Sequence, residues 1–118
     1  FRAACAQAPA LGADPVDLLR RAQEVYLSQG ITLIQDGLTE EREYQMLSAA
    51  AAAGALTVPV VGYVDLAHPG DLTASPHWLR ERDNLKLGGY KIFLDGSPQG
   101  RTAWMLEPYL GGDGQDRG

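Results

Sequence analysis

Short apolar runs that alternate with helical segments are the feature that most restricts how this chain can fold. Three such runs are predicted to be strands because they are brief and rich in β-branched or aromatic residues, at residues 31–35, 60–64 and 90–94. Strands that follow one another through helices form parallel sheets, since each helix returns the chain to the edge where the next strand begins. The sequence therefore predicts an α/β fold made of parallel β/α units.

Capping residues mark the predicted helices. Asp14-Pro15 supplies an N-cap acceptor followed by proline at the first helical position, and Gly30 ends that helix. Thr39 is predicted to cap a second helix, which carries glutamates in its first turn and runs to about Gly54. A further serine–proline pair predicts a short third helix over residues 76–83. Each predicted strand is thus preceded by a helix, as repeated β/α units require.

The composition excludes several classes of protein. A formal net charge of −5, with ten basic residues scattered among the 118, argues against a nucleic-acid surface. No apolar run approaches the roughly 20 residues of a membrane span, and no signal-peptide pattern is visible. The single cysteine, Cys5, allows neither an internal disulfide nor a cysteine-based zinc site. We therefore expect a cytoplasmic protein with neither a nucleic-acid nor a membrane partner.

Lys91 lies inside the third predicted strand, among apolar neighbours. A buried amine costs free energy unless the protein uses its charge or its reactivity. Alternation along the strand places Lys91, Phe93 and Asp95 on one face. Taken as a single residue, Lys91 is more readily explained as a lysine that reaches the strand end or pairs with Asp95 or Asp36.

The residues around this lysine carry a family resemblance. The block Lys-Ile-Phe-x-Asp-Gly-Ser-x-x-Gly-Arg-Thr-Ala occupies residues 91–103, and Leu-Glu-Pro-Tyr follows at residues 106–109. Together they resemble the metal-dependent amidohydrolase superfamily, in particular the branch that contains the N-substituted formamide deformylases. The likeness spans about residues 14–110 and implies a TIM-type (β/α)8 barrel, of which the chain would supply about strands two to four with their helices. The flanking residues would be an irregular segment at 1–13 and a flexible tail at 111–118.

The resemblance also implies roles for particular side chains. Lys91, carboxylated by carbon dioxide, would bridge two divalent metal ions, for which zinc is expected. Arg101 and Ser97 would bind the substrate, and Asp36 and Asp95 would accept hydrogen bonds from groups that hold the metal. The implied reaction is hydrolysis of a carbon–nitrogen bond in a small-molecule amide, formamide or cyclic imide.

The residue types alone leave ordinary structural explanations open. Arg101 also suits a surface position in a strand-to-helix loop. Asp36 and Asp65 each follow a predicted strand, where aspartate is common in turns. His68 and His77 lack the spacing of paired metal ligands, so both are predicted to be structural.

Several groups that the resemblance implies are missing from the sequence. No His-x-His pair is present, and a complete barrel needs about 250 residues. The chain also starts at Phe1 and ends in a glycine-rich stretch. We therefore expect a piece of a larger hydrolase that is inactive by itself and self-associates through apolar surface. The alternative is a small α/β binding or interaction domain without catalysis, which would be monomeric and would unfold cooperatively without metal.

Overall fold

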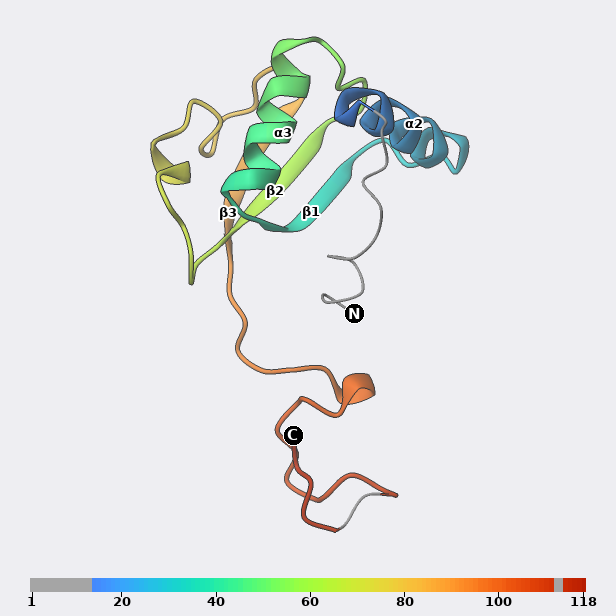
Figure 1. Ribbon diagram of the computed structural model, residues 1–118, viewed down its shortest axis with the longest axis vertical. Helices are drawn as coiled ribbons and strands as arrows, with labels where there is room; N and C mark the ends of the chain where they lie inside the picture. Colours follow the sequence, from blue (N-terminus) through green and yellow to red (C-terminus); the bar gives the residue numbers. More distant parts are fainter. Residues whose placement is uncertain (1–13, 112–113) are drawn as a thin grey trace.

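The computed structural model describes residues 14–111 and 114–118. The predicted irregular segment at residues 1–13 lies outside the described residues, and so does a small part of the predicted tail. The described residues form one three-stranded parallel sheet with helices packed against it (Figure 1). The predicted α/β fold with a parallel sheet is confirmed.

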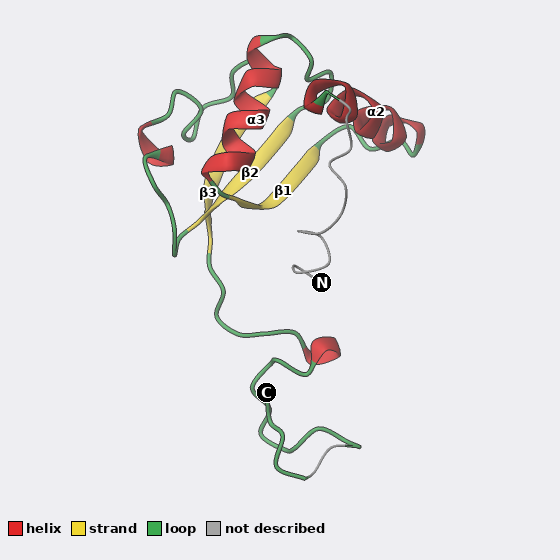
Figure 2. Ribbon diagram, in the orientation of Figure 1, coloured by secondary structure: helices red, strands yellow, loops and turns green. Residues whose placement is uncertain are grey.

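Each strand of the sheet pairs with the next strand along the chain, in the order β1-β2-β3. The strands are β1 (Ile34–Thr39), β2 (Val60–Asp65) and β3 (Leu85–Lys91). Helix α2 (Pro15–Ser28) precedes β1, and α3 (Glu41–Ala52) connects β1 to β2 across one face of the sheet (Figure 2). This connection through α3 brings β2 back parallel to β1, as expected for a β/α unit.

The connection from β2 to β3 differs from its prediction. It contains the 3-10 turn η1 (Leu72–Ala74), and the predicted helix at residues 76–83 is wrong. Leu79, Asp83 and Asn84 have φ angles of 56°, 52° and 62°, which a right-handed helix does not accommodate. The segment instead pairs with the first half of β3 through isolated bridges.

The third strand lies earlier in the chain than predicted. The sequence predicts it at residues 90–94, whereas β3 ends at Lys91. Gly88-Gly89 suggests a strand boundary in the sequence, yet it lies inside β3, where the pairing with β2 skips a residue. Gly89 has a φ of +139°, and glycine inside a strand is typical of such a bulge. The residues after Lys91 have no neighbouring strand to pair with, because β2 ends at Asp65.

The first strand, in contrast, lies later in the chain than predicted. Asp36-Gly37 predicts a turn that ends the strand, yet both residues continue β1 beyond the predicted residues 31–35. Thr39 consequently does not cap α3, because its hydroxyl donates to Asp36 Oδ2 at 2.8 Å. Glu40 is the N-cap residue and makes no side-chain capping bond.

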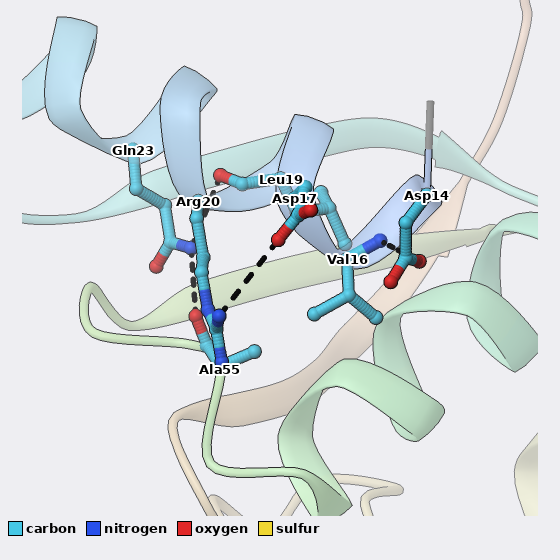
Figure 3. Close-up of polar contacts among 7 residues, drawn as sticks. All are labelled: Asp14, Val16, Asp17, Leu19, Arg20, Gln23 and Ala55. Atoms are coloured by element: carbon cyan, nitrogen blue, oxygen red, sulfur yellow. Dashed lines mark hydrogen bonds and ion pairs between the residues drawn. The ribbon is translucent and has the colours of Figure 1, made fainter. Parts of the chain in front are cut away.

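The first helix follows its prediction. The N–H of Val16 donates to Asp14 Oδ1 at 3.0 Å, and Pro15 occupies the first turn (Figure 3). Gly30, with a φ of +76°, follows the last turn. The start and end signals in the sequence are therefore both confirmed for α2.

Gln23 is buried and joins α2 to the segment that leads into β2. Its side-chain N–H groups donate to the carbonyls of Leu19 at 3.1 Å and Ala55 at 2.9 Å (Figure 3). Its side-chain oxygen accepts from the backbone N–H groups of Thr57 at 2.7 Å and Val58 at 3.0 Å. A buried amide costs free energy unless its donors and acceptors are satisfied, and here both ends of the amide are.

The core lies between α3 and the sheet. Small and branched apolar residues build its larger cluster: Leu47, Ala50, Ala51, Ala55, Leu56, Val60 and Leu85. A second cluster continues toward the carboxyl ends of the strands and contains Val64, Leu72 and Leu87. The alanines of α3 allow its backbone to approach the sheet closely, so this helix covers one face of β2 and β3.

Beyond β3 the chain leaves the sheet and extends away from it (Figure 1). This part, residues 92–118, is named the C-terminal segment; its described residues contain the 3-10 turn η2 (Pro98–Gly100) and are otherwise irregular. Large apolar side chains are exposed along it, including Phe93, Leu94, Trp104, Leu106 and Leu110. Among the helices that the structure describes, none is both long enough and apolar enough to cross a membrane.

Candidate functional site

The carboxyl ends of β2 and β3 bring two charged residues together. Asp65 ends β2, Lys91 ends β3, and the two are register partners in the sheet. The Leu66 N–H donates to the Lys91 carbonyl at 3.1 Å, which extends the pairing beyond Asp65. A cavity of about 270 Å³ lies at this edge, lined by Asp65, Leu66, Ala67, Lys91, Ile92 and Phe93. Parallel α/β proteins place their sites at the carboxyl edge, so this cavity is the candidate functional site.

Lys91 is half-buried at the end of β3 rather than inside a strand. Its Nζ lies 4.9 Å from the centre of the Phe93 ring, which is a cation–π contact. In the described part of the chain Lys91 forms no ion pair, so the expected alternative of a pair with Asp36 or Asp95 does not hold. The lysine amine therefore lies at the cavity, and no carboxylate of the described residues pairs with it.

Asp65 and His68 form a hydrogen-bonded pair next to this lysine. His68 Nδ1 lies 2.9 Å from Asp65 Oδ2, and the Ala67 N–H donates to Asp65 Oδ1 at 3.0 Å. The Asp65 side chain is 10% exposed and the His68 side chain 77%, so the carboxylate is covered while the imidazole faces solvent. Each residue alone is predicted to have only a structural role; the spacing Asp-x-x-His directly after a strand is the signal that could have suggested the pair.

The contact shifts both acid–base groups. The hydrogen bond from His68, followed by that from the Ala67 N–H, lowers the pKa of Asp65 below its ordinary value. The same hydrogen bond and the carboxylate charge raise the pKa of His68. Each partner therefore favours the charged form of the other.

Asp36 does not come together with Lys91. Its carboxylate accepts hydrogen bonds from the Thr39 hydroxyl at 2.8 Å and from the Leu38 N–H at 3.4 Å. Asp36 lines a different cavity, beside Leu19 of α2 and residues of α3. The structure thus places Asp36 on the helix-covered face of the sheet.

Asp95 organises the start of the loop that follows β3. Its carboxylate accepts from the Trp104 N–H, at 2.9 Å and 3.1 Å to the two oxygens, and from the Gly96 N–H at 2.7 Å. These backbone hydrogen bonds, with that from Trp104 the strongest, lower the pKa of Asp95. A side chain at Gly96 would clash with the Thr102 carbonyl oxygen. The loop from Asp95 to Trp104 is therefore closed by its own contacts.

Ser97 and Arg101 also take part in these local contacts. The Ser97 N–H donates to Thr102 Oγ1 at 2.9 Å, and the Ser97 hydroxyl donates to Gln99 Oε1 at 3.0 Å. Arg101 has a left-handed backbone with a φ of 54°, and its guanidinium donates to the Leu110 carbonyl at 2.7 Å. Both residues lie on the exposed C-terminal segment, apart from the lining of the cavity at Lys91.

His77 belongs to the core. It is 6% exposed, and its Nδ1 lies 2.9 Å from the Tyr44 hydroxyl, with the two rings edge to face. Burial lowers the pKa of His77, and the Arg82 charge acts in the same direction. The predicted structural role of this histidine is confirmed.

Residues 1–117 match a family model described as Amidohydrolase family. The match includes both the sheet and most of the C-terminal segment, and it agrees at the superfamily level with the resemblance carried by residues 91–109. No curated protein and no solved structure is significantly similar to the chain.

Proposed function

From the premise that the chain belongs to the amidohydrolase family and so forms part of a hydrolase, we propose that this hydrolase cleaves non-peptide carbon–nitrogen bonds in small amides or formamides. The observation that carries the proposal is the position of Lys91 at the carboxyl edge, where it lines a cavity beside Asp65. The residue block 91–103 favours the formamide deformylase-like branch within the family.

Amidohydrolases typically use divalent metal ions, so the donor groups at the carboxyl edge can be compared with what such an ion needs. Carboxylate and imidazole groups are suitable ligands, and Asp65 and His68 bring one of each to this edge. Within residues 14–111 and 114–118, however, no three His, Cys, Asp or Glu side chains gather closely enough to hold an ion. The described residues therefore offer suitable ligands but too few at one place to complete a metal site.

In the proposed enzyme Lys91 contributes the ligand that this part of the barrel supplies. The neutral Lys91 amine would add carbon dioxide and release one proton to give a carbamate, which is an anionic oxygen donor fixed at a strand end. The Lys91 carbamate would help to hold a divalent ion, which we propose to be zinc; when bound, such an ion would supply Lewis-acid chemistry toward a substrate carbonyl and water. Arg101 and Ser97 are the proposed substrate contacts, because Asp95 shapes the loop that carries them just after Lys91.

The three strands of this sheet are three of the eight that we propose for the complete barrel. Because the described residues do not assemble a metal site, the 118-residue chain is expected to show no turnover by itself. Measurable hydrolysis of formamides or amides by the purified chain would contradict this part of the proposal.

The two lysines of the chain allow a matched test. Both Lys86 and Lys91 lie in β3 and both are half-buried. In the complete gene product, Lys91→Ala is expected to lower the release of amine from N-substituted formamides by at least about a hundredfold, and added short carboxylates should restore part of it. Lys86→Ala should keep most of the activity.

Two results would overturn the proposal. One is a Lys91→Ala enzyme with undiminished activity, which would remove the lysine from the site. The other is a folded, metal-loaded gene product that hydrolyses none of the amides, formamides and imides tested, which would favour the non-catalytic binding domain.

A further inference from the structure

A second cavity lies on the helix-covered face of the sheet and shares no lining residue with the cavity at Lys91. Its volume is about 250 Å³, and its walls come from α2, β1, α3 and the start of β2. Apolar side chains such as Leu19, Ile34 and Met46 dominate these walls. The size is just below the range of roughly 300–1,000 Å³ that drug-sized ligands occupy, so a compact molecule would suit it.

The polar side chains in the wall differ in how well they are satisfied. Gln23 uses both ends of its amide within the protein, as described above. The Asp36 carboxylate accepts from Thr39 and Leu38. Glu43 Oε2, in contrast, is buried and has no hydrogen-bond partner among the residues that the structure describes.

A role in helix stability explains only part of this arrangement. Glu43 lies in the first turn of α3, where a negative charge interacts favourably with the helix dipole. The dipole accounts for the charge, but it supplies no donor to the buried oxygen. No lysine or arginine of the described residues forms an ion pair with Glu43. Burying a carboxylate oxygen without a donor is unfavourable, so a molecule that supplies one gains binding free energy.

We propose that this cavity binds a small amphipathic cation, an ammonium group attached to a compact apolar body. The apolar body would lie against the side chains of α2 and β1. The ammonium group would donate to the Glu43 carboxylate, with the Asp36 carboxylate nearby adding to the negative potential. The inference does not depend on the proposed hydrolytic function, because the cavity lies apart from the carboxyl edge.

The two methionines of the chain provide a direct measurement. Met46 lines the cavity and is 40% exposed, whereas Met105 lies on the C-terminal segment and is 38% exposed. In the 118-residue chain labelled with ¹³C at the methionine methyl groups, benzylammonium is expected to shift the Met46 signal saturably and to leave Met105 unchanged. Benzyl alcohol, a neutral molecule of similar shape, should bind about tenfold more weakly, because it lacks the charge-assisted hydrogen bond.

Substitutions in the cavity wall test separately the charge of Glu43 and the volume of the cavity. Glu43→Gln should weaken benzylammonium about tenfold and leave benzyl alcohol nearly unaffected, whereas Glu41→Gln, on the same helix but outside the cavity, should change neither. Ala22→Leu should fill the cavity and abolish the Met46 shift with both probes. This variant still tests the location of the binding site if Glu43→Gln does not fold. Equal affinity for the two probes, undiminished benzylammonium binding by Glu43→Gln, or no Met46 shift in the unaltered chain would overturn the proposal.

Discussion

Gln23 is the single side chain on which the seating of α2 depends most. Replacing it with methionine keeps its approximate volume but leaves the N–H groups of Thr57 and Val58 without an acceptor. We expect Gln23→Met to lower the free energy of unfolding by about 1 to 3 kcal/mol, the cost of one buried unsatisfied donor. The Val58 N–H is that donor, whereas Thr57 is exposed and its N–H can bind water instead. Urea denaturation measures this loss. Gln45→Met on the exposed side of α3 is the control, and an equal loss there would show that the network is unimportant.

The two histidines are expected to affect stability with opposite signs. Burial lowers the pKa of His77, so as the pH falls through about 6.5 the unfolded chain takes up a proton more readily and the free energy of unfolding decreases. The pKa of His68 is raised by Asp65, so its contribution is complete below about 6.5 and is lost as the pH rises through the folded-state value. Denaturant titrations between pH 5 and about 8.5 should show that His77→Gln removes the acid-side loss and that His68→Gln removes the alkaline-side loss. The same pH profile in both variants as in the unaltered chain would contradict these assignments.

Some residues of the candidate site could be predicted from the sequence and others could not. The difference depends on whether the contacts of a residue come from its neighbours in the sequence or from other strands. Lys91 could be selected because its chemistry conflicts with its apolar neighbours. The pairing of Lys91 with the end of β2 could not be predicted from the sequence, because a bulge shifts the register between β2 and β3. Asp65 and His68 are separated by only three positions, yet each alone suits an ordinary turn, so their hydrogen bond emerged only from the structure.

Close approach between β1, β2 and β3 depends on one glycine. A Cβ added at Gly62 would lie 2.5 Å from Thr39 Oγ1 and 3.1 Å from a methyl group of Leu87. Both neighbours are fully buried, and the β-branched Thr39 has little freedom to move aside. We expect Gly62→Ala to lower the free energy of unfolding by about 2 kcal/mol, measured by urea denaturation. Gly37→Ala in β1, where the nearest atom would be 4.0 Å away, should change it much less. Similar losses for both variants would argue against steric contact as the cause.

At the level of elements, the order of helices and strands could be predicted better than their bounds. The helix α2 carries its start and end signals in adjacent residues, so its limits followed from the sequence. The limits of β1 and β3 depend instead on which residues of β2 are available as partners. Asp36-Gly37 and Gly88-Gly89 resemble strand ends, but pairing with β2 retains both inside strands. The predicted helix at residues 76–83 failed for a related reason, because that segment pairs with β3.

The whole molecule is more extended than its length requires. Its radius of gyration is 17.8 Å, whereas a compact chain of this length has one of about 13.5 Å. The C-terminal segment contributes to this extension, since it projects away from the sheet (Figure 1). Its own hydrogen bonds hold this segment together, and these bonds do not involve the sheet. The Met105 N–H donates to the Arg117 carbonyl, and the Tyr109 N–H donates to the Asp116 carbonyl.

This shape predicts that the isolated chain associates with itself. Leu94, Leu106 and Leu110 are 93%, 88% and 91% exposed, and Trp104 is 69% exposed, so the C-terminal segment presents apolar surface to water. A parallel sheet is normally covered on both faces, and α3 covers one. Light scattering across a concentration series is expected to show a mass that rises above that of a 12.7 kDa monomer. Leu94→Gln with Leu106→Gln should shift the chain toward monomer, whereas Val25→Gln, an exposed change on α2, should not. A monomer at all concentrations, with a cooperative melting transition, would instead favour the small non-catalytic domain.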